Sequence, residues 1–475
     1  MRSLFLAAAL ALALPAPAIA QSAEVEAILA EAGPGTRWGL VVADESGAEV
    51  LAIDPEGRFM PASNTKVFTT AAAMWAQATG RFPDAEGAGT RVRLEGADVV
   101  LEGRGDARMS AASDCTVDCL ATLADAIAAR TKRVRHVVGD ATAFPDQRWS
   151  PGMSWNNIPF YYGTGVAALT LDDNEVTATV TAAAPGAAPA VSVSPYYSVE
   201  NHARTVAGSE NKLSVDRAPN TRVLVLTGTL GTEAKPVTWQ LAVDDPAHYA
   251  AWRFAEMLRA RGVAVSGEVR SHYRPLMAED DPAQRTGPVA RAPEEAALAT
   301  IVPGPLAEDL KTINTDSQNL HSELLLRRIG AAAGSGSIAD GQAVVTAMLA
   351  EAGVPPAMVS LYDGSGMSSY NRVAPRGMVR LLAWIARQPW GAQFRETLPV
   401  GGVAGTLRRR FADTPLAGKI FAKTGTLNAT NALAGWVTAA SGKTMIFAAY
   451  ANDVPEDVRA TAIMDRALLA VAAAN

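Results

Sequence analysis

An almost wholly apolar stretch, residues 67–75, places the strongest constraint on the fold of this chain. Because Pro61 and small polar residues precede the stretch and alanines fill it, we predict a helix here. A helix that is apolar on nearly every face belongs at the centre of a domain, away from water. Ser63 and Lys66 stand at its start, three residues apart, and would therefore share one face.

Ser63 and Lys66 form a Ser-x-x-Lys pair that could carry chemistry. A serine hydroxyl becomes a useful nucleophile when a base lies within hydrogen-bonding reach, and desolvation favours the neutral lysine that can be that base. The motif alone is weak, since Ser209 and Lys212 form a second copy in a polar stretch that we predict to be a loop. The interpretation of Ser63 therefore depends on the rest of the chain.

The beginning of the chain predicts export. Arg2, an apolar core that ends near Leu14 and the Ala-Ile-Ala sequence at 18–20 are typical of a secretory signal peptide, so we expect residues 1–20 to be removed. The apolar core is too short to span a bilayer after maturation. An uncleaved anchor or a lipoprotein is the less favoured alternative, because no cysteine follows the core. We expect a periplasmic protein with no stable membrane anchor.

Length, charge and cysteine content set further limits. A chain of 475 residues is too long for one ordinary core, so two or three domains are expected. The formal net charge of −6, without a basic block, argues against a nucleic acid partner. Cys115 and Cys119 are expected to form a local disulfide in an exported protein. The five histidines do not cluster in the sequence, so we expect neither a metal nor a cofactor.

Apolar patterning divides the chain into an outer part and a long insertion. A β-hairpin is predicted at 35–53, and short β-rich runs alternate with turns from about 86 to 291. The remaining predicted elements are helices at 120–130, 249–261, 306–329, 341–352, 375–387 and 456–474, and strands at 420–423, 432–437 and 445–450.

The order of these elements predicts an α+β fold. The first and last strands would share one antiparallel sheet with helices on its faces. We place a catalytic domain at 21–87 and 291–475, and one or two inserted domains, mostly β, at 88–290.

Two further motifs lie where the Ser63 hypothesis requires them. Ser317 and Asn319 form Ser-x-Asn in the helical region after the insertion, and Lys423-Thr424-Gly425-Thr426 lies on a late strand. Ser-x-x-Lys with Ser-Asp-Asn and Lys-Thr-Gly is the signature of class A β-lactamases and penicillin-binding proteins. Each motif alone is unspecific, as a second Ser-x-Asn at 154–156 shows. Their order and predicted secondary structure together are specific.

With these motifs the chain resembles the D-alanyl-D-alanine carboxypeptidases/endopeptidases of the penicillin-binding protein 4 type, which are low-molecular-mass class C serine peptidases. The resemblance covers nearly the whole mature chain and includes segments 162–174, 363–368 and 399–407. It implies a β-lactamase/transpeptidase-like domain interrupted by two nested small domains. It also implies peptidoglycan stem peptides and cross-links as substrates, and acylation by β-lactams.

The resemblance implies roles that suit the chemistry of the catalytic residues. Ser63 would attack the D-Ala-D-Ala peptide and Lys66 would take its proton. Ser317 would pass a proton to the departing D-alanine, while Asn319 would hold a substrate amide and Lys66. Lys423 would help to keep Lys66 neutral by charge repulsion.

The same resemblance assigns the grip on the substrate to the late strand. Lys423, Thr424 and Thr426 would hold the terminal carboxylate. The backbone N–H groups of Ser63 and Thr426 would form the oxyanion hole. Gly425 would let the substrate backbone lie close against the strand. Asn428, just after the motif, is a further candidate for substrate binding.

Asp172 and Arg372 are candidates for side-chain specificity. Asp172 matches an aspartate with which the family binds the free amine of a diaminopimelate side chain, and the alternative is a turn residue. Many relatives carry an arginine where this chain has Ser369, and Arg372 could substitute for it. Gln318 replaces the commoner aspartate of the middle motif with little expected effect. We interpret His321 as a packed helix residue rather than a catalytic base.

Two other functions stay open. A β-lactamase would need a base for fast deacylation, and no Glu-x-x-Leu-Asn follows the middle motif. A non-catalytic cell-wall-binding protein would keep the pocket without turnover, although all catalytic side chains are present. The sequence leaves the balance between carboxypeptidase and endopeptidase activity, and the oligomeric state, undetermined.

Overall fold

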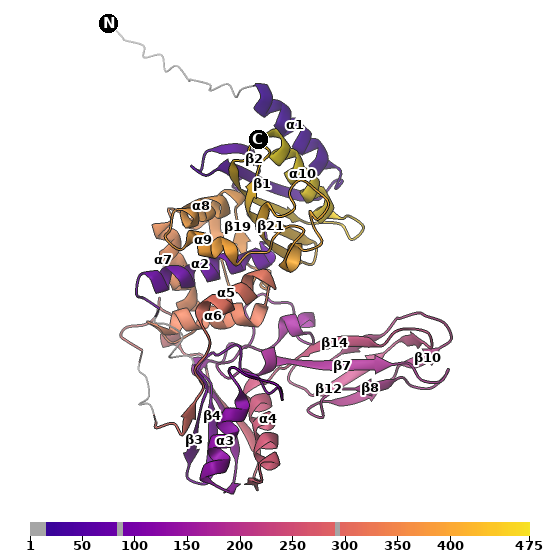
Figure 1. The fold of residues 1–475 in the computed structure, drawn as a ribbon, viewed down its shortest axis with the longest axis vertical. Helices are drawn as coiled ribbons and strands as arrows, with labels where there is room; N and C mark the ends of the chain where they lie inside the picture. The colour runs from indigo at the N-terminus through magenta and orange to yellow at the C-terminus, as the bar shows by residue number, and fades with distance from the viewer. Residues whose placement is uncertain (1–15, 83–88, 290–294) are drawn as a thin grey trace.

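The computed structural model describes residues 16–82, 89–289 and 295–475, and the two ends of the chain meet in one antiparallel sheet (Figure 1). The sheet has five strands in the order β2-β1-β22-β21-β20. Its strands are β1 (Arg37–Asp44), β2 (Glu49–Ile53), β20 (Ile420–Leu427), β21 (Thr430–Thr438) and β22 (Thr444–Asn452). Because β1 pairs with β22, the predicted α+β domain assembled from both ends of the chain is confirmed.

Helices cover both faces of this sheet. Alternate side chains of β1 enter different cores, since Leu40 and Val42 pack on one face and Val41 and Ala43 on the other. On the first face α1 (Ala16–Ala30) packs against α10 (Ala460–Ala474). The other face carries α2 (Thr65–Ala78), α5 (Leu306–Thr315), α6 (Asn319–Ala331), α7 (Ile338–Glu351), α8 (Pro375–Ala386) and α9 (Gly391–Glu396).

Helix α2 is the central helix that the sequence predicted. Every residue from Thr65 to Ala76 is buried. A short 3₁₀ turn, Ala62–Asn64, precedes it and contains Ser63. Lys66 lies in the first turn of α2, so the predicted pair spans the junction between the two elements.

The single helix predicted over 306–329 is wrong. The chain forms α5 and α6 instead, with a break at Ser317, whose φ is +65°. A left-handed residue cannot continue a right-handed helix. Gln318 then begins α6 by accepting the backbone N–H of Leu320 on its side chain at 2.7 Å. Ser317 therefore lies in a turn between two helices, and α6 continues to Ala331, past the predicted end at residue 329.

The insertion has two parts (Figure 1). One is a five-stranded sheet covered by α3 (Leu120–Arg130) and α4 (Pro246–Ala260). Its strands are β3 (Arg91–Glu95), β4 (Asp98–Glu102), β6 (Val137–Pro145), β16 (Val269–Arg274) and β17 (Ala299–Thr300). Because β17 pairs with β3, this sheet continues beyond residue 290, where we placed the end of the insertion.

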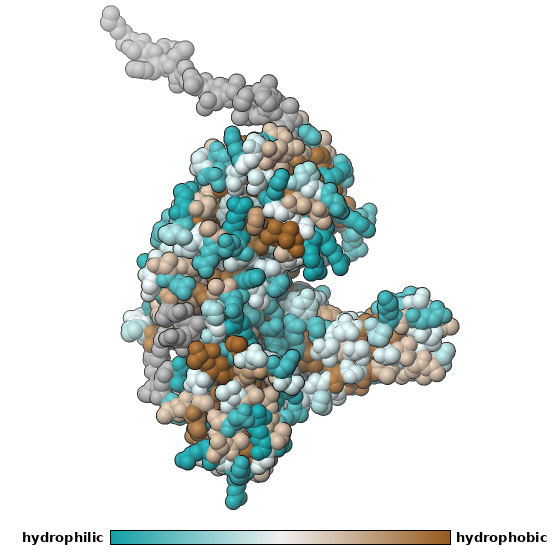
Figure 2. Space-filling model, viewed as in Figure 1, coloured by the Kyte–Doolittle hydropathy of each residue, from teal (hydrophilic) through white to brown (hydrophobic). Residues whose placement is uncertain are grey.

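The other part is an elongated β arm that projects from the molecule (Figure 1). Figure 2 shows an open hollow between this arm and the catalytic domain. The strands of the arm are β7 (Glu175–Thr181), β8 (Ala190–Ser192), β9 (Ser198–Asn201), β10 (Arg204–Val206), β11 (Ser214–Asp216), β12 (Val223–Thr227), β13 (Thr229–Gly231) and β14 (Val237–Ala242). Two further pairs of short strands lie outside these sheets. Strand β5 (Arg133–Val134) pairs with β15 (Ala264–Val265), and β18 (Val359–Ser360) pairs with β19 (Arg372–Val373).

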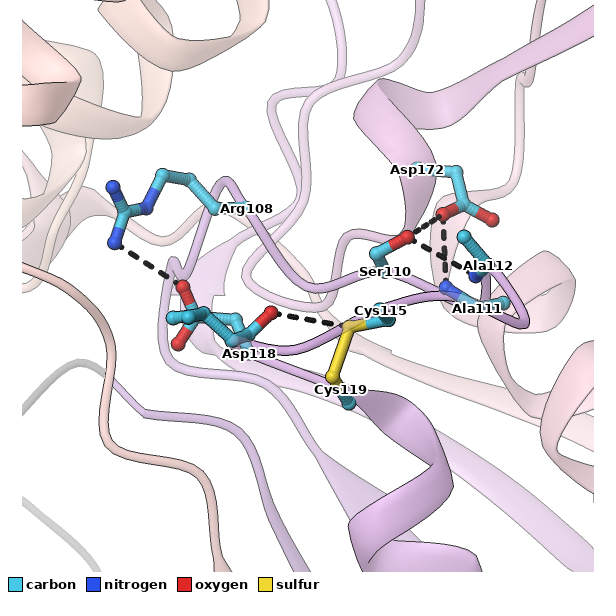
Figure 3. The surroundings of a disulfide bond; sticks show 9 residues. Arg108, Ser110, Ala111, Ala112, Cys115, Asp118, Cys119 and Asp172 are labelled. Carbon is cyan, nitrogen blue, oxygen red and sulfur yellow. Dashed lines mark hydrogen bonds and ion pairs between the residues drawn. A yellow bond between two sulfur atoms is a disulfide. The ribbon is translucent and has the colours of Figure 1, made fainter.

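The disulfide and the amino-terminal segment lie at the periphery of the fold. Cys115 and Cys119 form the predicted disulfide (Figure 3). Helix α1 begins at Ala16 and runs past the predicted cleavage site, while residues 1–15 of the predicted signal peptide lie outside the described residues. Within the described ranges, no helix is long and apolar enough to cross a membrane.

Candidate active site

The turn that carries Ser63 is held in a strained conformation by two glycine-containing segments. Ala62, just before Ser63, has a left-handed φ of +46°. A Cβ on Gly366 would lie 1.9 Å from the Ala62 carbonyl oxygen, and one on Gly425 would lie 2.6 Å from that of Pro61. Gly425 thus makes room for the Ser63 turn, and the close approach of substrate to Gly425 stays a prediction. Strain of this kind persists only where the surroundings enforce it.

Lys66 is fully buried and contacts the nucleophile directly. Its Nζ lies 2.9 Å from Ser63 Oγ, 2.6 Å from Asn319 Oδ1 and 2.7 Å from the Ser365 carbonyl oxygen. Burial lowers the pKa of Lys66 from 10.5 to about 7, against the opposing charges of Asp363 and Glu323. A substantial fraction of Lys66 is therefore neutral near pH 7.

The partners of the neutral amine define where its lone pair points. A neutral lysine has two N–H groups and one lone pair. The carbonyl oxygen of Ser365 accepts one N–H. Asn319 accepts the other through Oδ1, because its Nδ2 donates to the Tyr162 carbonyl oxygen at 2.8 Å and so fixes the orientation of the amide. The lone pair is left for the hydroxyl hydrogen of Ser63, as a general base requires.

Ser317 and Lys423 form a second pair in the same site. Lys423 is fully buried, and its Nζ donates to Ser317 Oγ at 2.8 Å. Burial and the charge of Lys66 lower the pKa of Lys423 well below its ordinary value. Burial is the cause of the lowered pKa of Lys66, and the predicted effect of Lys423 on Lys66 stays a prediction. Asn64 ties strand β20 to the Ser63 turn by donating to the Lys423 carbonyl oxygen at 2.8 Å.

The remaining residues predicted on the late strand lie along β20 and its turn. Thr424 Oγ1 lies 2.7 Å from Thr406 Oγ1. Thr426 is exposed, and its Oγ1 accepts from Asn431 at 3.4 Å. Asn428 is exposed in the turn between β20 and β21. The roles of these residues in substrate binding stay predictions.

The two specificity candidates are both engaged in local contacts. Asp172 accepts hydrogen bonds from Ser110 Oγ at 2.8 Å and from the Ala111 N–H at 2.9 Å (Figure 3). Arg372 donates to the Ser369 and Asn371 carbonyl oxygens at 2.7 and 2.8 Å. These contacts orient both side chains toward their own surroundings, and their roles toward a substrate stay predictions.

The structure adds two buried carboxylates to which the sequence assigned no role. Glu323 accepts the backbone N–H groups of Gly364 and Ser365, each at 2.9 Å. Asp363 accepts those of Gly366 and Ser368, and burial, together with the charge of Glu323, raises the pKa of Asp363 to about 6. These bonds hold the Ser365 carbonyl oxygen against Lys66. A sequence signal exists for Glu323, because it follows Asn319 by one helical turn and so shares its face of α6.

A pocket lies beside Lys66 at the junction of the two parts of the molecule. The insertion and the catalytic domain both line it, through residues that include Arg148, Met153, Tyr162, Asn319, Glu323 and Ser365. Two of its lining residues, Asn319 and Ser365, are themselves partners of Lys66. The pocket therefore borders two residues that contact Lys66.

The second Ser-x-x-Lys copy has no such surroundings. Ser209 is exposed in the β arm, and Lys212 pairs instead with Glu210 at 2.8 Å. By contrast, Ser63, Lys66, Ser317, Asn319 and Lys423 lie together in one site, and its two lysines are fully buried. An α+β domain with a serine in a strained turn, a buried lysine of lowered pKa and these two further motifs defines a serine acyl-transferring enzyme of the penicillin-binding class.

Comparison with known proteins specifies the family. The model of the D-Ala-D-Ala carboxypeptidase 3 (S13) family matches residues 21–473. The chain belongs to this family of serine-type D-Ala-D-Ala carboxypeptidases.

Individual relatives agree with this family. The chain is 34% identical over 442 residues to a D-alanyl-D-alanine carboxypeptidase of Actinomadura sp. (strain R39), covering 88% of this chain and 79% of that protein. It is 27% identical over 326 residues to D-alanyl-D-alanine carboxypeptidase DacB of Haemophilus influenzae, covering 66% of this chain and 64% of that protein. The crystal structure of penicillin-binding protein 4 from H. influenzae has the same fold, with a TM-score of 0.78 at 22% identity over 94% of this chain and 98% of that one.

Proposed function

We propose that this protein is a periplasmic enzyme that removes the terminal D-alanine from peptidoglycan stem peptides through a Ser63 acyl-enzyme. We further propose that it cuts cross-links as a DD-endopeptidase and that penicillin acylates Ser63. The observation that carries the proposal is the geometry of Lys66, whose two N–H groups are taken by Asn319 and Ser365 while its lone pair faces Ser63.

The first half of the reaction forms the acyl-enzyme. Ser63 Oγ attacks the carbonyl carbon of the penultimate D-alanine as its proton passes to Lys66. The charge on the carbonyl oxygen would be stabilised by the backbone N–H groups of Ser63 and Thr426. The C–N bond then breaks, and the proton that Lys66 took from Ser63 passes by way of Ser317 to the departing amine, which returns Lys66 to its neutral form. Lys423 contacts Ser317 at 2.8 Å.

The second half releases the shortened peptide. A water molecule attacks the ester carbonyl carbon, and Lys66 is the base that can accept its proton. The ester bond breaks, Ser63 regains its proton and the new carboxylate leaves. An endopeptidase reaction has the same steps, since it differs only in what the departing D-amino acid carries. Because the two reactions share these steps, the same residues can support endopeptidase activity.

Two features support a periplasmic location. The predicted signal peptide directs the chain out of the cytoplasm. The Cys115–Cys119 disulfide fits an oxidising compartment. Cell fractionation tests the location, and recovery of the full-length protein in the cytoplasm would contradict it.

Product analysis tests the activity. The purified protein is incubated with a soluble pentapeptide ending in D-Ala-D-Ala, with a cross-linked muropeptide dimer and with a chromogenic cephalosporin. We expect release of D-alanine from the first, cleavage of the second and only slow turnover of the third. Rapid cephalosporin turnover without D-alanine release would favour a β-lactamase. A Ser63→Ala variant that keeps all of these activities would overturn the proposal.

A further inference from the structure

A turn of the insertion is held in an unfavourable backbone conformation next to the catalytic domain. Three consecutive residues, Asp172, Asp173 and Asn174, have left-handed φ values of +48°, +53° and +52°. None is a glycine, and left-handed residues with side chains normally occur singly because Cβ approaches the carbonyl oxygen. Such a conformation persists only where the surrounding structure enforces it, and it is typical of functional sites.

The turn is fixed from both ends. Asp172 accepts hydrogen bonds from Ser110 and Ala111 (Figure 3). Asn174 is fully buried, accepts the Leu171 N–H at 3.2 Å and donates to the Gly165 carbonyl oxygen at 2.9 Å. With its two neighbours anchored inside the insertion, the middle residue, Asp173, has a defined position.

Asp173 contacts the catalytic domain beside the second catalytic motif. Its Oδ1 lies 2.8 Å from Nε2 of His321, which is 4% exposed and stands two residues after Asn319 on α6. The other ring nitrogen of His321 faces Asp309 Oδ1 of α5 at 3.5 Å. His321 is therefore enclosed between a carboxylate of the insertion and one of the catalytic domain.

Two further contacts reach the same motif from the insertion. Glu175, directly after the strained turn, accepts from Gln318 Nε2 at 3.4 Å. The Tyr162 carbonyl oxygen accepts from Asn319 Nδ2 at 2.8 Å. The insertion thus contacts Gln318, Asn319 and His321 in succession.

The charges around His321 favour its protonated form. Burial lowers the pKa of His321, but the hydrogen bonds and charges of Asp173 and Asp309 outweigh burial and raise it to about 9. The other charged groups of this cluster are Glu175 on β7, Arg328 on α6 at 3.0 Å from Asp309, and Arg108 of the insertion at 3.9 Å from Asp309. Across the described ranges no group of three or more acidic, histidine or cysteine side chains is placed to hold a metal ion, so the cluster is an ion-pair network.

We propose that Asp173 and His321 are positioning residues, an ion pair through which the insertion sets the orientation of the Ser317–Asn319 turn. This turn lies at a helix break, so helical hydrogen bonds do not fix its orientation. Side-chain contacts such as the Asp173–His321 pair fix it instead. Correct orientation places Asn319 Oδ1 at Lys66 and Ser317 Oγ at Lys423. The inference rests on the proposed function of these two residues in acyl transfer.

Three variants test the role of the pair. Asp173→Asn keeps the shape and removes the charge, Asp173→Ala removes the contact, and His321→Gln removes the titrating ring. Asp457→Asn, at an exposed aspartate before α10, is the matched control. For D-alanine release we expect kcat about tenfold lower in each Asp173 variant with KM nearly unchanged, because a misplaced catalytic group lowers the rate without removing substrate contacts.

The pH profile separates positioning from a merely structural role. Wild-type activity falls as pH rises through about 9, where His321 loses its proton. In Asp173→Asn this fall moves to lower pH, because the variant lacks a carboxylate that raises the pKa of His321. Penicillin acylation rates, measured in parallel, follow the same trend. Melting temperatures report whether each variant is folded.

The outcomes distinguish this inference from the proposed function. A wild-type protein that releases no D-alanine contradicts the proposed function, and acylation by penicillin then still reports on the pair. An active wild type whose Asp173→Ala and Asp173→Asn variants keep its kcat and its alkaline limb overturns the positioning role. A rise in KM with unchanged kcat would overturn it too, since that result indicates substrate binding by Asp173.

Discussion

Acylation of Ser63 by penicillin is expected to rise with pH through about 7, because Lys66 must be neutral to accept the hydroxyl proton. With a pKa of about 7, roughly 9% of Lys66 is neutral at pH 6 and roughly 90% at pH 8. The acylation rate therefore increases about tenfold between these values and then levels off, until loss of the His321 proton lowers it above about pH 9. An ordinary lysine with a pKa of 10.5 would be only about 0.3% neutral at pH 8, and the rate would keep rising about tenfold per pH unit.

A single substitution moves this profile in a defined direction. The charge of Glu323 raises the pKa of Lys66, so Glu323→Gln lowers it, and the midpoint moves below 7. The glutamine oxygen can still accept the N–H groups of Gly364 and Ser365, while the buried Arg327 guanidinium, 3.2 Å from the other oxygen of Glu323, loses its carboxylate partner. Glu456→Gln, at an exposed glutamate, is the matched control and leaves the midpoint unchanged.

Stopped-flow measurement of acylation by a fluorescent penicillin gives the rate constant from pH 5.5 to 10. The limiting rate at saturating penicillin reports the step in which Lys66 acts. A rate that rises through pH 9 without a plateau would refute the lowered pKa of Lys66. A midpoint that moves upward in Glu323→Gln would refute the electrostatic reasoning.

Three further predictions concern packing and proton transfer. Gly366→Ala places a methyl group against the Ala62 carbonyl oxygen and lowers the acylation rate more than about a hundredfold, whereas Gly287→Ala, which meets nothing within 4 Å, leaves it unchanged. Ser317→Ala lowers D-alanine release about a hundredfold or more, measured by product analysis, because the departing amine loses its proton donor. Asp244→Ala leaves the buried Arg217 guanidinium unpaired and destabilises the fold by about 3–5 kcal/mol in chemical denaturation, and an unchanged midpoint would contradict the value of this ion pair.

The sequence predicted the elements whose signals are local. The apolar run after Lys66, the hairpin at 35–53 and the late strands all have strong periodicity, and each forms as expected. That the three motifs meet in one site was also predictable, because their fixed order specifies a known chemistry. Burial of the helix then accounts for the lowered pKa of Lys66, as the apolar run indicated.

Features that depend on tertiary packing were not predictable. The break at Ser317 was missed because apolar residues recur with helical spacing on both sides of it, and only the left-handed backbone separates α5 from α6. The packing of Gly425 against the Ser63 turn was missed because the two segments are distant in sequence. His321 was correctly taken as a packed residue, but its partner Asp173 lies in the insertion and no pattern connects the two.

Covalent labelling at Ser63 tests the central claim most directly. The purified protein, Ser63→Ala and Ser209→Ala are incubated with fluorescent penicillin, and the labelled peptide is identified by mass spectrometry. The site described above predicts that wild type and Ser209→Ala are labelled on Ser63 and that Ser63→Ala is not. Label that persists in Ser63→Ala, or that disappears in Ser209→Ala, would contradict the assignment of the nucleophile.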